Sequence, residues 1–295
     1  MSSTDLVRVI VNPEAGHGEG ARLLGSLERA SRQLGVKLRV KLTAHPGHAT
    51  RLAAEAARRE DAPLVVMGGD GTIGEVINGI AGREVILGII AVGTGNDVAR
   101  SLALPVNDPK RALEIISTGK VAEIDLGRAG CRYFASVLGV GFPVQVAAVA
   151  NRIKRLKGPL VFFLAMYRAL LRMKAVRIEL ELDGARIESD LTSIVIQNTP
   201  YTGGGLLIAP GAQLNDGLLD VITVDNIGKL DLMLNLPKLY KGKHLQHHAF
   251  SLSQCKSIKI RAKDRLPTMF DGDLFGHTPL EVTTEHRALK VIVKQ

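Results

Sequence analysis

Cysteine and tryptophan are scarce in this sequence of 295 residues. Neither of the two cysteines, Cys131 and Cys255, has another cysteine or a histidine at metal-ligand spacing. A disulfide-rich scaffold and a zinc site are therefore disfavoured, and a reducing compartment fits the composition. Tryptophan is absent and aromatic residues make up 4%, which leaves few platforms on which nucleic-acid bases could stack. We therefore expect no nucleic-acid partner.

Long uninterrupted apolar runs are also absent. Residues 133–151 and 191–215 are uncharged and long enough to span a bilayer. The first stretch contains two glycines and a proline, and the second contains two prolines and a glycine triplet, so neither predicts a continuous helix. The N-terminus lacks a basic segment followed by a long apolar one, so we expect no secretory signal and a cytoplasmic protein.

Basic residues outnumber acidic residues by 38 to 29, which gives a net charge of +9. This excess favours anionic partners such as nucleotides, nucleic acid or acidic lipid surfaces, and does not by itself choose among them. With 46% hydrophobic and 23% charged residues, the chain has the composition of a folded globular protein. A chain of this length often divides into two domains.

The first 125 residues alternate between strand and helix patterns. We expect strands at residues 6–11, 36–42, 64–67 and 85–92, and helices at residues 21–34, 47–59 and 96–102, with another beginning near residue 72. This alternation predicts a parallel sheet with helices on both faces. Ligands of such sheets bind at the carboxyl ends of the strands.

After residue 125 the expected strands follow one another closely. They lie at residues 133–140, 175–182, 186–189, 192–197, 219–224 and 257–262, with helical interruptions at 144–154, 160–173 and 230–240. Turn signals such as Asp183-Gly184 favour an antiparallel sandwich or barrel. We therefore predict an α/β domain at residues 1–125 and a β-rich, sandwich-like domain at 126–295, whose last strand is free to return to the first domain.

Three glycine-rich loops follow strands of the first domain, at residues 12–16, 68–72 and 93–97. Glycine lets backbone N–H groups approach phosphate oxygens, and the following helix directs a partial positive charge at them. Any one loop could be a tight turn, but three together indicate a polyphosphate ligand. None matches the Walker motif or the dinucleotide-binding fingerprint.

Asp70 lies in the second loop, where its carboxylate would repel phosphate unless a divalent cation lay between them. A nucleotide with Mg²⁺ removes this conflict, and the alternative is a turn aspartate that bonds its own backbone. In the third loop, Thr94, Asn96 and Asp97 fit phosphate binding and an ordinary helix N-cap equally well.

Six segments together resemble the diacylglycerol kinase catalytic-domain family of lipid kinases. They are VNPEAG, GGDGTIGEVINGI, VGTGNDVARSL, IDLG, GGGLLIAPGAQLNDGLLD and FDGD. The GGDGT loop is shared in similar form with NAD kinases and phosphofructokinases, whereas NDGLLD makes the resemblance specific. The resemblance implies an N-terminal ATP-binding domain, a C-terminal β-rich domain and ATP-dependent phosphorylation of a lipid hydroxyl.

Carried over residue by residue, the resemblance also implies site residues, with Asp70 facing the phosphates and Mg²⁺. The implied ATP contacts are Asn12, Pro13, Glu14, Ala15, Gly16, Thr43, Gly68, Gly69, Asp70, Gly71, Thr72, Ile73, Gly74 and Thr94. A structural Mg²⁺ is implied at the carboxylate of Asp216 and the backbone carbonyls of Gln213 and Leu218.

The implied general base is Asp273, the last residue of the triplet Asp271-Gly272-Asp273, with Asp271 as its competitor. The family usually has glutamate at this position, which is one methylene longer. A second departure is Ile73-Gly74, where the family commonly has Leu-Asn, and it loosens one contact on the phosphate side. Without the resemblance, Asp216-Gly217 and Asp271-Gly272 are ordinary hairpin-turn dipeptides.

Two C-terminal segments combine basic charge with other features. His244, His247 and His248 lack an accompanying carboxylate or thiol, so we expect a solvated basic turn, or a contact with acidic head groups, instead of a metal site. Residues 158–177 form an apolar run bordered by basic residues. An interfacial helix and a helix packed on the second domain both fit that pattern.

The function expected from these observations is that of a cytoplasmic, ATP- and Mg²⁺-dependent lipid kinase. It would visit the anionic inner face of the membrane and phosphorylate a diacylglycerol-like or related lipid. The alternatives are a kinase of a soluble acceptor such as NAD and a noncatalytic nucleotide-binding regulator. The sequence leaves a homodimer open.

Overall fold

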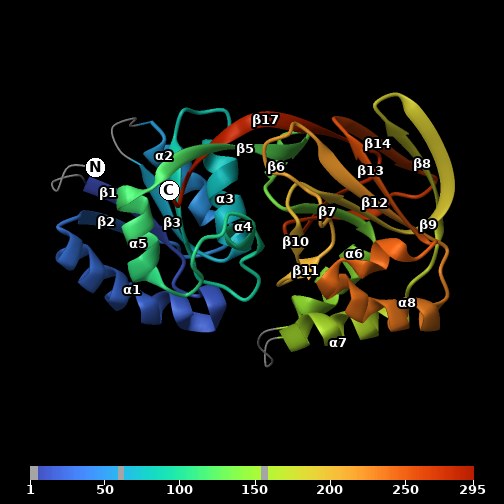
Figure 1. Cartoon of the computed structure of the whole chain (residues 1–295), viewed down its shortest axis with the longest axis horizontal. Helices are drawn as coiled ribbons and strands as arrows, with labels where there is room; N and C mark the ends of the chain where they lie inside the picture. Colours follow the sequence, from blue (N-terminus) through green and yellow to red (C-terminus); the bar gives the residue numbers. More distant parts are fainter. Residues whose placement is uncertain (1–5, 59–62, 154–158) are drawn as a thin grey trace. The chain divides into compact units, whose positions relative to one another are not determined.

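The computed structural model describes residues 6–58, 63–153 and 159–295. The chain divides into two compact units (Figure 1). The first comprises Met1–Ile124 and Arg287–Gln295, and the second comprises Asp125–His286. The final segment of the chain therefore belongs to the first unit. The chain passes between the units on β5 (Lys120–Ala129) and β17 (Leu280–Val293), which pair with each other.

A parallel sheet forms the centre of the first unit. Its strands, in spatial order, are the C-terminal end of β17, β4 (Ile86–Ala91), β3 (Leu64–Gly68), β1 (Leu6–Val11) and β2 (Lys37–Leu42). The helices are α1 (Ala15–Leu34), α2 (His48–Ala56), α3 (Asp70–Ile80), α4 (Asp97–Ser101) and α5 (Pro109–Thr118). The expected α/β architecture is confirmed.

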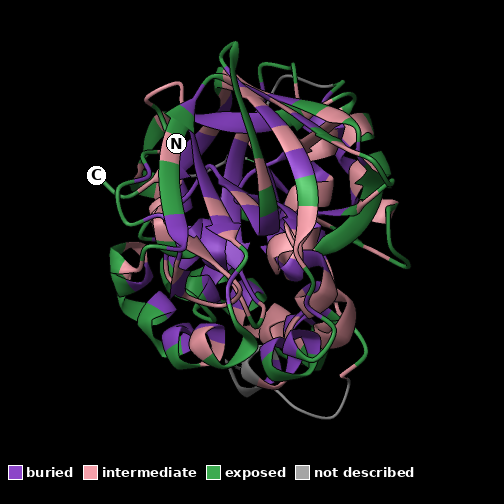
Figure 2. Ribbon diagram, turned by 90° about the vertical axis from the view of Figure 1, so that its right-hand side faces the viewer, coloured by how far each residue is buried: buried purple, intermediate pink, exposed green. Residues whose placement is uncertain are grey.

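Helices cover both faces of this sheet because its central strands are buried along nearly their whole length. Val9 and Val11 pack with side chains of α1 and α5 in one hydrophobic cluster. Arg8, which precedes Val9 on β1, points the other way, and its guanidinium donates to the carbonyl of Ala56 at the end of α2. Figure 2, in which the side that carries the second unit faces the viewer, shows buried residues along strands and on parts of the helices.

The second unit is built on antiparallel strands. They are β6 (Arg132–Phe134), β7 (Val137–Gly141), β8 (Val176–Leu182), β9 (Ala185–Gln197), β12 (Leu219–Asp225), β13 (Phe250–Cys255), β14 (Ser257–Ala262), β15 (Pro267–Phe270) and β16 (Asp273–His277). A short hairpin of β10 (Tyr201–Thr202) and β11 (Leu206–Leu207) stands apart. The 13-residue strand β9 pairs with β7, β8 and β12, which joins the strands into one curved sheet.

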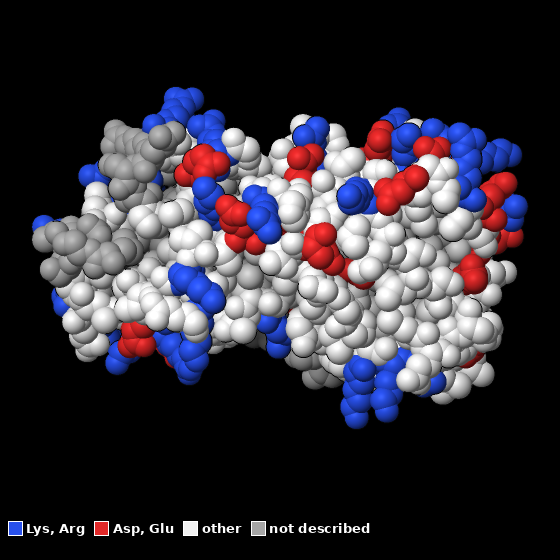
Figure 3. All heavy atoms as spheres, turned by 45° about the horizontal axis from the view of Figure 1, so that its top comes forward, with Lys and Arg blue, Asp and Glu red and all other residues white. Residues whose placement is uncertain are grey.

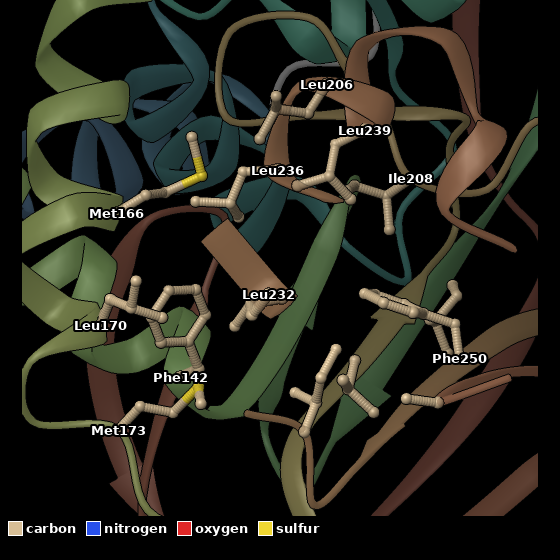
Figure 4. Packing of buried hydrophobic residues seen from close by; sticks show 14 of the residues in the cluster. Phe142, Met166, Leu170, Met173, Leu206, Ile208, Leu232, Leu236, Leu239 and Phe250 are labelled. Atoms are coloured by element: carbon tan, nitrogen blue, oxygen red, sulfur yellow. The ribbon is translucent and has the colours of Figure 1, made fainter. Parts of the chain in front are cut away.

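Alternation along the strands gives this unit two large hydrophobic cores, beside a small cluster that contains Val137 and Met269. Leu219 and Val221 of β12 point into the cluster enclosed between strands, whereas Ile222 and Val224 point to the opposite face. That opposite face is covered by α6 (Phe142–Ala150), α7 (Pro159–Leu170) and α8 (Lys229–Asn235), with the 3₁₀ turns Leu236–Lys241 and Lys243–Gln246. Figure 4 shows side chains from these helices and strands packed together.

Three local expectations need correction. Residues 185–197 form one strand instead of two, because the polar residues Glu188 and Asp190 lie on an exposed face and pair with Arg177 of β8. Residues 133–140 form two strands, β6 and β7, separated at Ala135 and Ser136. The first helix begins at Ala15 and is interrupted by a left-handed segment at residues 16–18.

The expected solvated histidine turn is also wrong for His244, which is fully buried. Its Nε2 lies 3.1 Å from the carbonyl oxygen of Ile208, and its ring meets Phe250 edge-on. Burial lowers the pKa of His244, against the raising effect of that carbonyl. His247 is partly buried and its Nε2 lies 3.3 Å from the carboxylate of Asp231, so only His248 is exposed.

The described residues include no helix that is both long enough and apolar enough to cross a bilayer. Within residues 158–177, the side chains of Met166, Ala169 and Leu170 are buried in the hydrophobic core that α6, α7 and α8 cover. The inner side of α7 is therefore packed on the second unit.

Candidate active site

The three glycine loops meet at one edge of the first unit's sheet. They follow β1, β3 and β4, which are parallel, so their carboxyl ends lie together. The second and third loops touch through their backbones, since a Cβ built on Gly93 would lie 2.7 Å from the Cα of Gly69. A Cβ on Gly16 would lie 3.6 Å from the Cα of Gly93. Glycine at position 93 is what allows this close approach.

Asn12 joins the first loop to the second. Its side-chain amide donates to Oγ1 of Thr72 (2.8 Å), and its Oδ1 accepts from the backbone N–H of Glu14 (3.0 Å). The backbone N–H of Thr43, just after β2, donates to the carbonyl of Val11 at the end of β1 (2.9 Å). These bonds hold the first loop, Thr43 and the start of α3 at the same edge.

Asp70 lies at the start of α3 and bonds to the third loop. Its Oδ1 accepts from the backbone N–H of Val98 (3.3 Å), so this carboxylate caps α4, which has no cap from its own Asn96 side chain. A Cβ on Gly95 would lie 2.5 Å from Oδ2 of Asp70 and 3.5 Å from Oδ2 of Asp97. Two carboxylates therefore flank Gly95.

Burial raises the pKa of Asp70 above its ordinary value, and backbone N–H groups of Val98, Asn96 and Asp97 act in the opposite direction. Nearby, Asn96 is 2% exposed with a left-handed backbone, and its amide donates to the carbonyl of Gly93 (2.7 Å). Its buried Oδ1 has no hydrogen-bond partner in the described part of the chain. The third loop is thus stabilised from within, and Thr94 is exposed at its tip.

The loop that carries Asp216 lies in the second unit and is fixed by a buried residue, Asp125. The backbone N–H of Gly217 donates to Oδ2 of Asp125 (2.6 Å), and the N–H of Asp125 donates to the carbonyl of Leu214 (2.6 Å). Oδ1 of Asp216 accepts from the N–H of Leu218 (3.0 Å).

A second acid, Asp220, stands beside this loop. Burial raises the pKa of Asp220, the amide of Gln254 lowers it, and the charge of Asp216 raises it again. Asp216 and Asp220 are four residues apart in the sequence, and the charge of Asp216 acts on Asp220. In the three described ranges, no group of three or more His, Cys, Asp or Glu residues is placed to hold a metal ion.

Asp271 and Asp273 have different environments although they are two residues apart. The carboxylate of Asp271 accepts from three consecutive backbone N–H groups, those of Ala135, Ser136 and Val137, each at 2.9 Å. It therefore anchors the connection between β6 and β7. Asp273 begins the exposed strand β16; its side chain is 55% exposed and lies 3.4 Å from the guanidinium of Arg132. That guanidinium stacks on the ring of Phe275 at 4.5 Å.

Comparison with known families gives two matches that together cover most of the chain. Residues 6–129 match the family described as "Diacylglycerol kinase catalytic domain", and residues 136–293 match "YegS C-terminal NAD kinase beta sandwich-like domain". A diacylglycerol kinase of Mycobacterium tuberculosis is 33% identical over 294 residues, which cover 97% of this chain and 94% of that protein. The chain belongs to the diacylglycerol kinase family.

Other relatives agree with this membership. A diacylglycerol kinase of Bacillus subtilis is 28% identical over 289 residues, covering 97% of this chain and 95% of the relative. The crystal structure of a Bacillus anthracis protein, named provisionally as a diacylglycerol kinase, superposes with a TM-score of 0.80 at 25% identity. The superposition covers 98% of this chain and 97% of that one. The predicted membership of this lipid kinase family and the predicted fold class are confirmed.

The first unit brings together most of the residues that the family resemblance implied for ATP. Asn12, Gly16, Gly69, Asp70 and Thr72 lie within the contacts described above. The side chains of Ala15 and Ile73 are buried in the unit, so these residues can offer a ligand only their backbones. Nothing lies within 4 Å of a Cβ built on Gly71, so the backbone at the start of α3 is open, and N–H groups at a helix start suit phosphate oxygens.

The residues implied for the structural Mg²⁺ and for the general base belong to the second unit, and their surroundings show what the sequence could not. The roles of Asp125 and Arg132 were missed, although Asp125 stands in the quoted IDLG segment. Its only sequence signal is an acid inside an apolar strand pattern, and it proves to be fully buried. The Asp216 loop offers one carboxylate and backbone carbonyls, a donor type that suits Mg²⁺.

Proposed function

We propose that this member of the family is an ATP-dependent kinase that phosphorylates the hydroxyl of a diacylglycerol-like or related lipid at the anionic inner surface of the membrane. ATP would supply the phosphoryl group, and Mg²⁺ would neutralise phosphate charge. The observation that carries the proposal is the meeting of three glycine loops with the carboxylate of Asp70, which caps α4, at the edge of a parallel sheet. Phosphoryl transfer depends mainly on positioning and charge neutralisation, which such an edge can supply.

In this proposal the first unit binds the nucleotide through its backbone. The N–H groups of Gly69, Gly71 and the start of α3 face phosphate oxygens, aided by the positive end of the helix. Asn12 keeps the first loop against Thr72, so that the phosphates meet a preformed surface. Asp70 contributes the negative charge that a bound cation requires, and its raised pKa makes that charge dependent on pH.

The second unit contributes the acceptor side. We assign proton removal from the lipid hydroxyl to Asp273, because its carboxylate is half exposed while that of Asp271 is occupied by three backbone donors. Asp216, with the carbonyls of Gln213 and Leu218, would hold a structural Mg²⁺ that stiffens its loop. Asp125 supports the same loop from the interior.

A soluble acceptor such as NAD is the second candidate. It is favoured by the description of the C-terminal match, which refers to an NAD kinase sandwich. The family membership of the N-terminal half and the 33% identical relative favour the lipid. A noncatalytic nucleotide-binding role would predict ATP binding without transfer to either acceptor.

The test is a transfer assay with radiolabelled ATP and Mg²⁺. Dispersed lipids of several classes and NAD⁺ are offered in parallel, and products are identified by mass. We expect a labelled phospholipid product and no labelled dinucleotide. A labelled dinucleotide would replace the proposal with the second candidate, and ATP binding without any labelled product would support the regulator.

A further inference from the structure

Four large apolar side chains are exposed on two adjacent helices of the second unit. Tyr167 is 50% exposed and Leu171, just after α7, is 65% exposed, while Leu230 and Leu234 of α8 are each 66% exposed. In both pairs the residues are four apart, so they lie on the same side of their helix. We call Tyr167, Leu171, Leu230 and Leu234 the α7–α8 ridge.

The ridge is not part of the core, because the opposite sides of both helices are already packed. Met166 and Leu170 of α7 and Leu232 of α8 are buried in one hydrophobic cluster (Figure 4). The ammonium group of Lys229 donates to the backbone carbonyl of Leu171 (2.8 Å), which joins the end of α7 to the start of α8. Leu171 and Leu230 therefore lie close together on a fixed surface.

Basic residues greatly outnumber acidic ones in the segments that carry the ridge and follow it. Residues 159–174 and 229–243 contain seven basic residues and one acid, Asp231. The basic residues are Arg168, Arg172, Lys174, Lys229, Lys238, Lys241 and Lys243, and all are exposed. Asp231 is already engaged by the ring of His247 and the amide of Asn235. No acidic side chain in the described ranges forms an ion pair with any of the seven.

The basic residues of the β-strands behave differently. Arg177, Arg186 and Arg261 lie 3.0 to 3.2 Å from Glu188, Glu181 and Glu179, respectively. Figure 3 shows basic and acidic side chains side by side on the face that it presents. The basic side chains of these strands are thus paired with acidic neighbours, whereas the basic side chains of the segments around the α7–α8 ridge are available to an anionic partner.

We propose that the α7–α8 ridge docks the protein on an anionic bilayer. Leucine and tyrosine side chains would enter the region between head groups and acyl chains, while the surrounding lysines and arginines lie over acidic head groups. Four side chains offer too little area for a stable protein interface, which buries about 800 Å² on each partner. The inference rests on the proposed function in one respect: a lipid acceptor is the reason for the enzyme to visit a membrane.

The test is sedimentation of the full chain with vesicles. Vesicles of phosphatidylcholine alone are compared with vesicles that also contain phosphatidylglycerol. Binding should need the anionic lipid and should weaken at a salt concentration of about 0.5 M, where charges are screened beyond roughly 4 Å. The double variant Leu230→Gln/Leu234→Gln should bind anionic vesicles at least about tenfold more weakly, because burial of leucine is lost.

A second test variant, which removes charge beside the ridge, and two matched control variants show where on the surface the vesicles bind. Ile187→Gln/Leu252→Gln changes two apolar residues of β9 and β13 that are 48% and 41% exposed, and its binding should equal that of the wild type. Arg168→Gln/Arg172→Gln/Lys174→Gln should weaken binding and flatten its salt dependence. Arg32→Gln/Lys37→Gln/Arg39→Gln removes the same charge from exposed positions of the first unit and should bind nearly as wild type.

Wild-type binding by the ridge variant, or equal losses in ridge and control variants, would overturn the docking face. Transfer to a short-chain diacylglycerol in detergent micelles separates this inference from the proposed function. The ridge variant should keep full transfer there while losing transfer to diacylglycerol in vesicles. If the wild type phosphorylates no lipid in micelles yet binds vesicles through the ridge, the proposed function fails and the docking face stands.

Discussion

The carboxylate of Asp125 lies 2.9 Å from Nδ1 of His286, so the first and last residues of the second unit touch each other. The other oxygen of Asp125 accepts from the N–H of Gly217, and a Cβ on Gly217 would lie 3.2 Å from the His286 ring. One buried carboxylate thus fixes both points at which the chain leaves the unit and the loop that carries Asp216.

Asp125→Ala should therefore lower the free energy of unfolding by about 3 kcal/mol, because it removes a fully buried carboxylate and leaves the partly buried N–H of Gly217 without its acceptor. His286→Gln should cost less than about 1 kcal/mol, since the imidazole is 51% exposed. Urea denaturation of the two variants beside the wild type measures both values. Equal losses would show that the contact with His286, and not the contact with the Gly217 loop, supplies the stability.

Gly93→Ala should separate nucleotide binding from folding. The added methyl would lie 2.7 Å from the Cα of Gly69 and 2.9 Å from Oδ1 of Asn96, so the second and third loops must move apart. We expect ATP affinity to fall more than about tenfold, with a modest loss of stability. Gly211→Ala is the control, because nothing lies within 4 Å of a Cβ there. Titration calorimetry measures the ATP affinity of both variants. If both bound ATP with the affinity of the wild type, the prediction would be wrong.

Asp70→Asn should fold and lose activity by orders of magnitude. Asparagine keeps an oxygen for the N–H of Val98, so the cap on α4 survives, while the negative charge that a bound cation needs is removed. Turnover with the lipid acceptor, measured beside the melting temperature, checks both parts. Near-normal turnover would remove Asp70 from the mechanism.

The same variant should show how pH acts on stability. Burial raises the pKa of Asp70 in the folded state, so the wild type gains stability from protonation below the ordinary value of about 3.9 and loses it as pH rises through the raised value. The substituted amide carries no charge, so Asp70→Asn should be more stable than the wild type at neutral pH. Melting temperatures measured from pH 7 down to about 4 should converge; a gap that stays constant would mean that the pKa is not raised.

Asp271→Asn and Asp273→Asn should fail in different ways. In Asp271→Asn an amide nitrogen replaces one carboxylate oxygen, either the one that accepts from Ala135 or the one that accepts from Ser136 and Val137. At least one backbone N–H then loses its acceptor, so the free energy of unfolding should fall by about 2 kcal/mol. Asp273→Asn should keep stability and ATP affinity but lose turnover by about 10² to 10⁴, the contribution of a general base. Single-turnover rates together with melting curves distinguish them; a larger loss of turnover in Asp271→Asn at full stability would reverse the assignment.

The parts of the fold predictable from sequence are those whose signal is local. β3 is buried on both faces and appears as a continuous apolar run, β1 departs from such a run only at Arg8, and a glycine-rich loop follows each of them. Helix α5 was overlooked although its signals are present: Asp108 caps the N–H of Arg111, and Pro109 stands at the first turn. Strand β16 could not be found, because all five of its residues are exposed and no alternation marks it.

The candidate site likewise contains residues that a local sequence motif predicts and residues whose roles depend on distant parts of the chain. The residues of the glycine loops could be named because motif and site coincide within a few positions of the chain. The anchoring role of Asp271 depends on backbone donors more than 130 residues away, and that of Asp125 on a loop about 90 residues away. Such pairings arise from strand order and register, which a single sequence does not specify.

Asp216 supplies the last prediction, which concerns metal. If its carboxylate and the carbonyls of Gln213 and Leu218 hold a structural Mg²⁺, the ion binds the folded state only and stabilises it by mass action. Chelation should then lower both the melting temperature and the activity of the wild type. Asp216→Ala should begin with a lower melting temperature and respond less to chelator, while Asp225→Ala, another acid of the second unit, should respond as wild type does. Because Asp220 lies near Asp216, it is the first alternative ligand: an undiminished chelator response in Asp216→Ala, abolished by Asp220→Ala, would move the ion to that residue.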